Sequence, residues 1–95
     1  MPIFAVTYRY SDDVTTRDAL RTEHRDYLRG LADQGLLLVS GPTDPAGALL
    51  LFRTDDKTRV DALVEKDPFT TSGVNTAITT AEWEPVIGPL LPALR

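Results

Sequence analysis

The stretch Arg21-Thr22-Glu23-His24-Arg25-Asp26-Tyr27-Leu28 lies inside the first helix that the sequence predicts, and it contains the only histidine of the 95 residues. At helical spacing, His24 shares one face with apolar neighbours (Leu20, Tyr27, Leu28 and Leu31). A polar ring buried in such a stripe costs free energy unless its nitrogens find hydrogen-bond partners. The rest of the chain therefore has to supply a partner for His24.

A strand is expected before this helix, over residues 3–10, because β-branched and aromatic residues alternate there. One face of that strand is apolar (Phe4, Val6, Tyr8 and Tyr10). The helix is expected to start at a threonine cap, Thr15 or Thr16, and to end near Gln34. Gly35 then takes the left-handed position that often follows a helix. For Gly30, inside the helix, we expect close packing as the reason.

A hairpin is expected after the first helix. Residues 36–40 are nearly all apolar and predict a buried strand that stops at the breaker pair Gly41-Pro42. Residues 43–47 have the composition of a turn, and residues 48–54 predict the partner strand.

A second helix and a last strand complete the pattern. Asp55 or Asp56 is expected to cap a helix that ends at Asp67-Pro68, because the residue before a proline avoids the helical region. Residues 69–73 are expected to form a compact connector. The side chains of residues 75–84 alternate between two faces and predict the fourth strand.

The order β-α-β-β-α-β predicts an α+β, ferredoxin-like fold in one domain, residues 1–95, with a four-stranded antiparallel sheet and two helices on one face. The second and third strands are apolar on both faces, so the face away from the helices needs a cover. We expect a second copy of the sheet there, a homodimer whose interface buries about 1,200 Å² or more. The alternative is a monomer whose apolar, proline-containing tail, about residues 86–95, folds under the sheet.

Composition excludes several classes of function. A net charge of −4, with arginines scattered among acids, argues against nucleic-acid binding. The absence of cysteine excludes disulfides and thiolate nucleophiles, and one histidine with scattered acids predicts no metal site. The absence of a Gly-x-Ser-x-Gly elbow argues against serine hydrolase chemistry. No phosphate-binding glycine loop occurs, and no cofactor is expected. We find no signal-peptide pattern or apolar run of membrane length and expect a cytoplasmic protein that contacts no membrane.

Topology suggests the partner of His24. In this fold the two helices run antiparallel, so the first half of one lies near the end of the other. Asp67, at the expected end of the second helix, continues its apolar stripe (Val60, Leu63 and Val64). A carboxylate within hydrogen-bond reach would fix the imidazole tautomer and make a pair capable of acid or base chemistry. The alternative is a satisfied core histidine, with Asp67 only ending a helix.

Three ordered motifs resemble the YciI-like (YCII-related domain) family: Arg21-x-x-His24-x-x-x-Leu28, then Gly35-x-Leu37-x-x-Ser40-Gly41-Pro42, then Asp67-Pro68-Phe69-x-x-x-Gly73-Val74. The resemblance spans the first strand to Trp83-Glu84-Pro85 and implies a dimeric α/β-barrel fold. It also implies an active site built on a His–Asp pair, here His24 and Asp67. The neighbouring motif positions are candidates for substrate binding (Arg21, Ser40, Gly41, Pro42 and Phe69).

The resemblance implies a reaction class, because the family has been linked to the dehydrochlorination of chlorinated aromatic compounds. We expect a cofactor-independent dehydrochlorinase, lyase or isomerase acting on a small cyclic or acidic organic molecule, with His24 as general base or acid and Asp67 as its orienter. The short loop over residues 43–47 leaves the substrate open. The alternative is a non-catalytic, dimeric small-molecule-binding or accessory domain in which the pair is a structural hydrogen bond.

Overall fold

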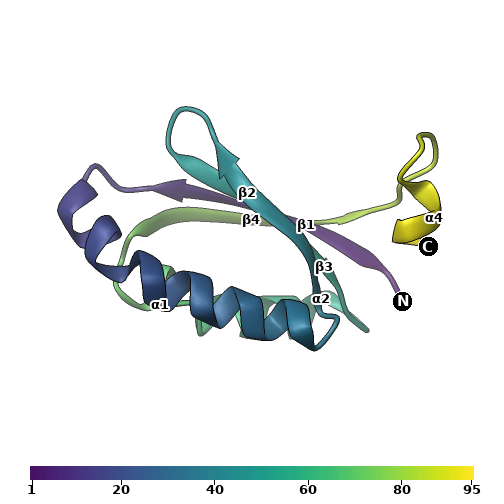
Figure 1. Ribbon diagram of the computed structural model, residues 1–95, viewed down its shortest axis with the longest axis horizontal. Helices are drawn as coiled ribbons and strands as arrows, with labels where there is room; N and C mark the ends of the chain where they lie inside the picture. Colours follow the sequence, from purple (N-terminus) through teal and green to yellow (C-terminus); the bar gives the residue numbers. More distant parts are fainter.

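The computed structural model describes residues 1–95 and contains one four-stranded sheet with its long helices on a single face (Figure 1). The elements follow the chain as β1 (Ile3–Tyr10), α1 (Val14–Asp33), β2 (Leu37–Thr43), β3 (Gly47–Arg53), α2 (Lys57–Glu65), α3 (Pro68–Thr71), β4 (Asn75–Trp83) and α4 (Leu91–Leu94). The expected α+β class and βαββαβ order are confirmed, and α3 and α4 are additional short helices. None of the helices combines the length and the apolar character needed to cross a membrane.

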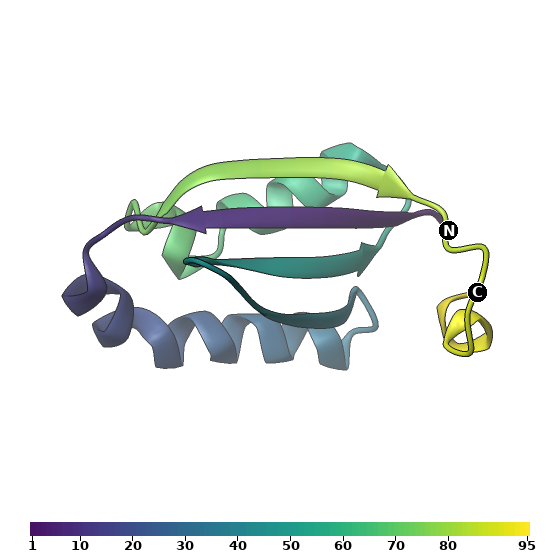
Figure 2. The same ribbon diagram turned by 90° about the horizontal axis from the view of Figure 1, so that it is seen from above.

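The sheet has the strand order β2-β3-β1-β4, and all neighbouring strands are antiparallel. Seen from above, α1 lies on the β2 side beneath the sheet and α2 on the β4 side (Figure 2). The Tyr27 hydroxyl of α1 donates a hydrogen bond of 2.7 Å to the carbonyl oxygen of Leu63 in α2, so the two helices are joined directly. The core lies between this helix layer and the inner face of the sheet.

Strand β1 is central and supplies the middle of the core, as its alternation predicted. Phe4, Val6 and Tyr8 are all buried on the helix side. Tyr8 is paired with Ala48 of β3 on one side and with Ile78 of β4 on the other, so its ring lies near the middle of the sheet. A side chain in this position can reach the layer between the two helices.

Helix α1 begins earlier than expected, and its cap is Asp13 rather than Thr15 or Thr16. The Asp13 carboxylate accepts hydrogen bonds from the Thr16 backbone N–H at 3.0 Å and from the Thr16 hydroxyl at 2.6 Å. A carboxylate satisfies a free N–H of the first turn and also interacts favourably with the positive end of the helix. At the other end Gly35 has a φ of 78°, which confirms the left-handed residue predicted there.

Strand β2 does not stop at Gly41-Pro42 but continues through both residues to Thr43. Pro42 pairs with Ala48 of β3. The prediction was wrong because β2 is an edge strand, where the missing N–H of a proline is tolerated. The continuation keeps β2 paired with β3 as far as Thr43 and Gly47, at the end of the sheet where β1 also ends.

The prediction that Asp67 is the last residue of the second helix is wrong. Helix α2 ends at Glu65, and Asp67 has the extended φ and ψ angles of −63° and 128° as the cap of α3. Pro68 explains the difference, because it restricts the preceding residue to extended conformations and favours the first position of a new helix. The carboxylate is therefore aimed by a capping turn and not by the periodicity of α2.

The tail beyond Trp83 extends past the end of the sheet and does not lie across its open face (Figures 1 and 2). Its apolar side chains are largely in solvent, with Val86, Ile87 and Leu90 exposed by 62%, 94% and 73%. The alternative in which the tail folds under the sheet is therefore not what the structure has. Most of the open face stays uncovered within one chain, and Ile3, at the end near the tail, is buried.

Two glycines are predicted to respond in opposite directions when replaced by alanine. A Cβ at Gly47 would collide with the backbone carbonyl oxygen of Tyr8, whereas a Cβ at Gly30 would meet nothing within 4 Å. We expect Gly47→Ala to lower the free energy of unfolding by about 1–3 kcal/mol. Gly30→Ala should raise it by about 0.5–1 kcal/mol, because close packing does not require this glycine. Urea unfolding followed by circular dichroism measures both changes, and a stabilised Gly47→Ala would contradict the register of β1 and β3.

Candidate functional site

His24 and Asp67 lie in direct contact beneath the sheet. The His24 side chain comes from α1 and is buried, and its Nδ1 is 2.7 Å from Oδ1 of Asp67. A carboxylate oxygen can only accept, so Nδ1 carries the hydrogen and donates. In the neutral ring the lone pair is then on Nε2.

Asp67 is fully buried and is held by three donors from three elements. Oδ1 accepts from His24 Nδ1 and from the Phe69 backbone N–H at 3.0 Å, and Oδ2 accepts from the Tyr8 hydroxyl at 2.9 Å. A buried carboxylate is costly unless its oxygens are paired in this way. The three donors come from β1, α1 and α3, so formation of the site depends on the complete fold.

Tyr8 is the member of this network that the sequence did not single out. Burial raises the pKa of its hydroxyl well above the usual range, and the negative charge of Asp67 raises it further. The hydroxyl therefore stays protonated and acts as a donor. Alternation had placed Tyr8 on the inner face of β1, but no feature of the sequence showed that Asp67 would lie opposite.

Phe69 covers one side of the imidazole. Its ring is stacked on the ring of His24 with a centroid separation of 3.8 Å and an interplanar angle of 3°. The edge-to-face contact of Phe69 with Tyr10, at 5.4 Å and 84°, holds the phenyl ring in place. Stacking and the bond to Asp67 together leave the His24 ring a single orientation.

A cavity of about 370 Å³ opens beside His24, between α1 and the end of β2. All the substrate-binding candidates from the sequence line this cavity together with His24 (Arg21, Ser40, Gly41, Pro42 and Phe69). The other lining residues come from β1, α1 and β3 (Tyr10, Arg17, Arg25, Leu28, Ala48 and Leu50). Asp67 does not line it and lies behind the imidazole. The cavity thus has one acid–base group and a partly apolar wall.

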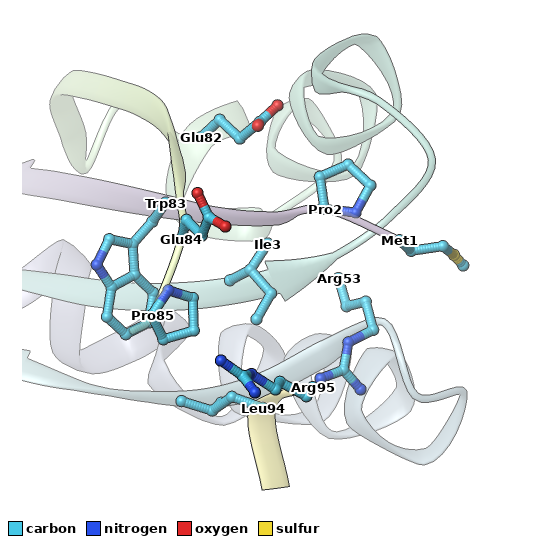
Figure 3. A pocket seen from close by; sticks show the side chains of 10 residues that line it. All are labelled: Met1, Pro2, Ile3, Arg53, Glu82, Trp83, Glu84, Pro85, Leu94 and Arg95. Atoms are coloured by element: carbon cyan, nitrogen blue, oxygen red, sulfur yellow. The ribbon is translucent and has the colours of Figure 1, made fainter. Parts of the chain in front are cut away.

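The largest cavity of the chain lies elsewhere. It measures about 630 Å³ and is found where the ends of the strands meet the tail, lined by Arg53, Glu82, Trp83 and Arg95 among others (Figure 3). It contains no histidine and none of the residues around Asp67. No group of three or more His, Asp or Glu side chains in the chain is arranged to hold a metal ion. We therefore place the candidate site at the smaller cavity, where a buried imidazole is held by a carboxylate.

Comparison with known proteins agrees with this fold. The model of the YCII-related domain family matches residues 1–84. A solved structure of 5-chloro-2-hydroxyhydroquinone dehydrochlorinase from Burkholderia phenoliruptrix, in complex with 2,5-dihydroxybenzoquinone, superposes with a TM-score of 0.77 at 25% sequence identity, over 86% of this chain and 93% of that one. An uncharacterized NIPSNAP domain protein from Burkholderia xenovorans has a TM-score of 0.44 at 16% identity, over 90% and 95% of the two chains. No curated protein matches the sequence.

Replacement of Tyr8 by phenylalanine should weaken the network around Asp67. Loss of a hydrogen bond to a buried carboxylate is expected to lower the free energy of unfolding by about 1.5–3 kcal/mol at neutral pH. Tyr27→Phe is the matched control, because its hydroxyl donates to an uncharged carbonyl and its loss should cost about 1 kcal/mol or less. Urea unfolding of both variants measures the difference, and equal losses would argue against the network.

The same variant should change the stability at alkaline pH. The raised pKa of Tyr8 contributes stability that is complete below the unfolded-state value of about 10 and is lost as the pH rises above it. Wild type should therefore lose stability between about pH 10 and 12 more steeply than Tyr8→Phe. Identical slopes for the two proteins would contradict the buried position of this hydroxyl.

Proposed function

This chain belongs to the YCII-related domain family, and we propose that it is a small-molecule enzyme in which His24 transfers a proton and Asp67 orients the imidazole. One observation carries the proposal. His24 Nδ1 is held by a fully buried carboxylate, while Nε2 has no partner in the chain and is not among its buried unpaired atoms. The lone pair of Nε2 is therefore accessible from the cavity that His24 lines.

The reaction that fits this arrangement is elimination or isomerisation started by removal of a proton. In the dehydrochlorinase form, Nε2 takes a proton from the substrate and the freed electron pair forms a new π bond. Chloride then leaves with the electrons of the carbon–chlorine bond, so that HCl is lost overall. Asp67 stabilises the imidazolium that forms, and the proton is afterwards released to water. These steps need no cofactor, and they are supported by the dehydrochlorinase activity of the structural neighbour.

The alternative function is a binding or accessory domain with no reaction. It is favoured by the completeness of the hydrogen bonding at Asp67, since a satisfied buried network also holds a fold together. The two functions differ in turnover and not in stability. Loss of the imidazole removes a hydrogen bond to the buried Asp67 carboxylate in either case, so both functions predict a loss of about 1–3 kcal/mol in the free energy of unfolding.

We also propose that the protein is a homodimer formed through the open face of the sheet. Ala48, Leu50 and Phe52 point toward the helices, so alternation puts Leu49 and Leu51 on the open side. Apolar side chains of three strands are exposed there, with Val39, Leu49 and Trp83 at 57%, 41% and 40%. A second copy of the same sheet offers the complementary surface that such a face needs.

The catalytic proposal predicts a large loss of turnover in two variants. With 5-chloro-2-hydroxyhydroquinone as the first substrate and chloride release as the assay, His24→Asn and Asp67→Asn should each lower kcat/KM by about 10²–10⁴-fold. Glu23→Gln is the control, because Glu23 precedes His24 on the exposed side of α1. Unchanged turnover in a folded His24→Asn would refute the proposal, and absence of turnover in wild type would remove the dehydrochlorinase form.

Urea unfolding of His24→Ala, compared with Glu23→Gln, tests the buried pair itself. A loss of about 1–3 kcal/mol is expected whichever function is correct, and an unchanged stability would contradict the hydrogen bond to Asp67. The two functions are separated by turnover, because wild type that binds small molecules and turns over none supports the binding domain.

If the protein is a dimer, one substitution on the open face should halve the mass of the particle in solution. Leu49→Arg places a charge at the centre of the open face and should convert a dimer into a monomer. Val14→Arg is the matched control, since Val14 is 50% exposed at the start of α1, away from that face. Light scattering after gel filtration measures the mass, and a monomeric wild type would contradict the proposal.

A further inference from the structure

The charged groups around the His24 cavity are all of one sign. The chain has a net charge of −4, yet the cavity is lined by Arg17, Arg21 and Arg25 and by no aspartate or glutamate. These arginines are four residues apart on α1 and therefore form one column along the helix. Like charges at this spacing slightly destabilise a helix, so folding stability does not account for the column.

The three guanidinium groups keep most of their hydrogen-bonding capacity free. Arg21 pairs with Asp18 at 2.7 Å, but the two side chains are 43% and 53% exposed, so water screens this contact. Arg17 lies 5.2 Å from the centre of the Tyr10 ring. Arg25 makes no ion pair or side-chain hydrogen bond within the chain. Each arginine has five N–H donors, so a ligand can recruit this column without breaking a buried contact.

The charges act on the interior of the cavity as well as on its rim. Burial and the negative charge of Asp67 raise the pKa of the Tyr10 hydroxyl, and Arg17, Arg21 and Arg25 all oppose that rise. Tyr10 lines the same cavity as His24 and contacts Phe69. The three cations therefore face the group of side chains at which we place the chemistry.

We propose that the ligand of this cavity is an organic anion, a carboxylate or an ionised ring hydroxyl, whose charged group is held by Arg21 and Arg25 with Arg17 beside them. This inference rests on the proposed function in that it takes the His24 cavity as the substrate site. The carbon skeleton lies against the apolar wall formed by Leu28, Ala48 and Leu50. A volume of about 370 Å³ lies in the range of small-molecule sites.

The position of the arginines also suits the reaction. Arg25 is adjacent to His24 in the helix, and Arg21 lies three residues before it, about one turn away. When Nε2 removes a proton, negative charge grows on the substrate, and guanidinium groups already in place stabilise that charge. The same column would thus bind the anion and lower the barrier to its deprotonation.

The test compares a charged probe with a neutral one of the same shape. Benzoate and benzamide are titrated into the full-length protein, with binding followed by NMR shifts of the α1 amides. We expect benzoate to bind wild type at least about tenfold more tightly than benzamide, and its affinity to fall as salt is added. Arg21→Gln and Arg25→Gln should each weaken benzoate binding about five- to tenfold and leave benzamide unchanged.

Arg59→Gln is the matched control, because Arg59 is exposed on α2 and lies outside this cavity. Equal binding of the two probes, no binding of benzoate, or an equal loss in Arg59→Gln would overturn the anion site. His24→Asn separates this result from the proposed function, since it should keep benzoate binding while turnover is lost. If His24→Asn keeps full turnover and the arginine variants lose benzoate binding, the anion site stands and the role of His24 fails.

Discussion

The carboxylate of Asp67 is fully buried, and several elements of the fold must come together to pair it. It has no contact with water, so each oxygen must be paired inside the protein, and the donors come from Tyr8, His24 and the Phe69 backbone. These donors belong to the central strand, the first helix and the turn that Asp67 itself caps. Bringing them together requires the strand register and the helix packing to be correct at once. A charge that is costly to bury thus gives the native arrangement an advantage over compact alternatives.

Charged groups of opposite sign lie on either side of the imidazole. Asp67 lies behind the imidazole, Phe69 covers one side of the ring, and the arginine column lies at the cavity. His24 is therefore placed between a buried negative charge and exposed positive ones. A proton accepted at Nε2 would be stabilised from behind, while negative charge left on the substrate would be stabilised from the front. In the proposed mechanism the arginines bind the anion, and Asp67 stabilises the imidazolium that forms.

The two faces of the sheet differ in what covers them. The inner face closes on the helices and holds the network, and the outer face presents small and apolar side chains, including Leu49 and Trp83, to solvent. A sheet with both faces apolar is unusual for an isolated antiparallel fold. The tail beyond Glu84 is also largely apolar, lies past the sheet and falls outside the residues matched by the family. Self-association would cover the outer face without disturbing the cavity beneath the inner one.

Periodicity predicted the order of elements and the inner face of β1, and fold topology brought His24 near Asp67, because both limit which residues can meet. The sequence did not show that Asp67 caps α3, because an aspartate before a proline can either follow the end of one helix or begin the next. It also passed over Tyr8 and the full arginine column. Whether Tyr8 reaches Asp67, and whether scattered arginines line one cavity, depends on strand register and helix rotation, which only long-range packing decides.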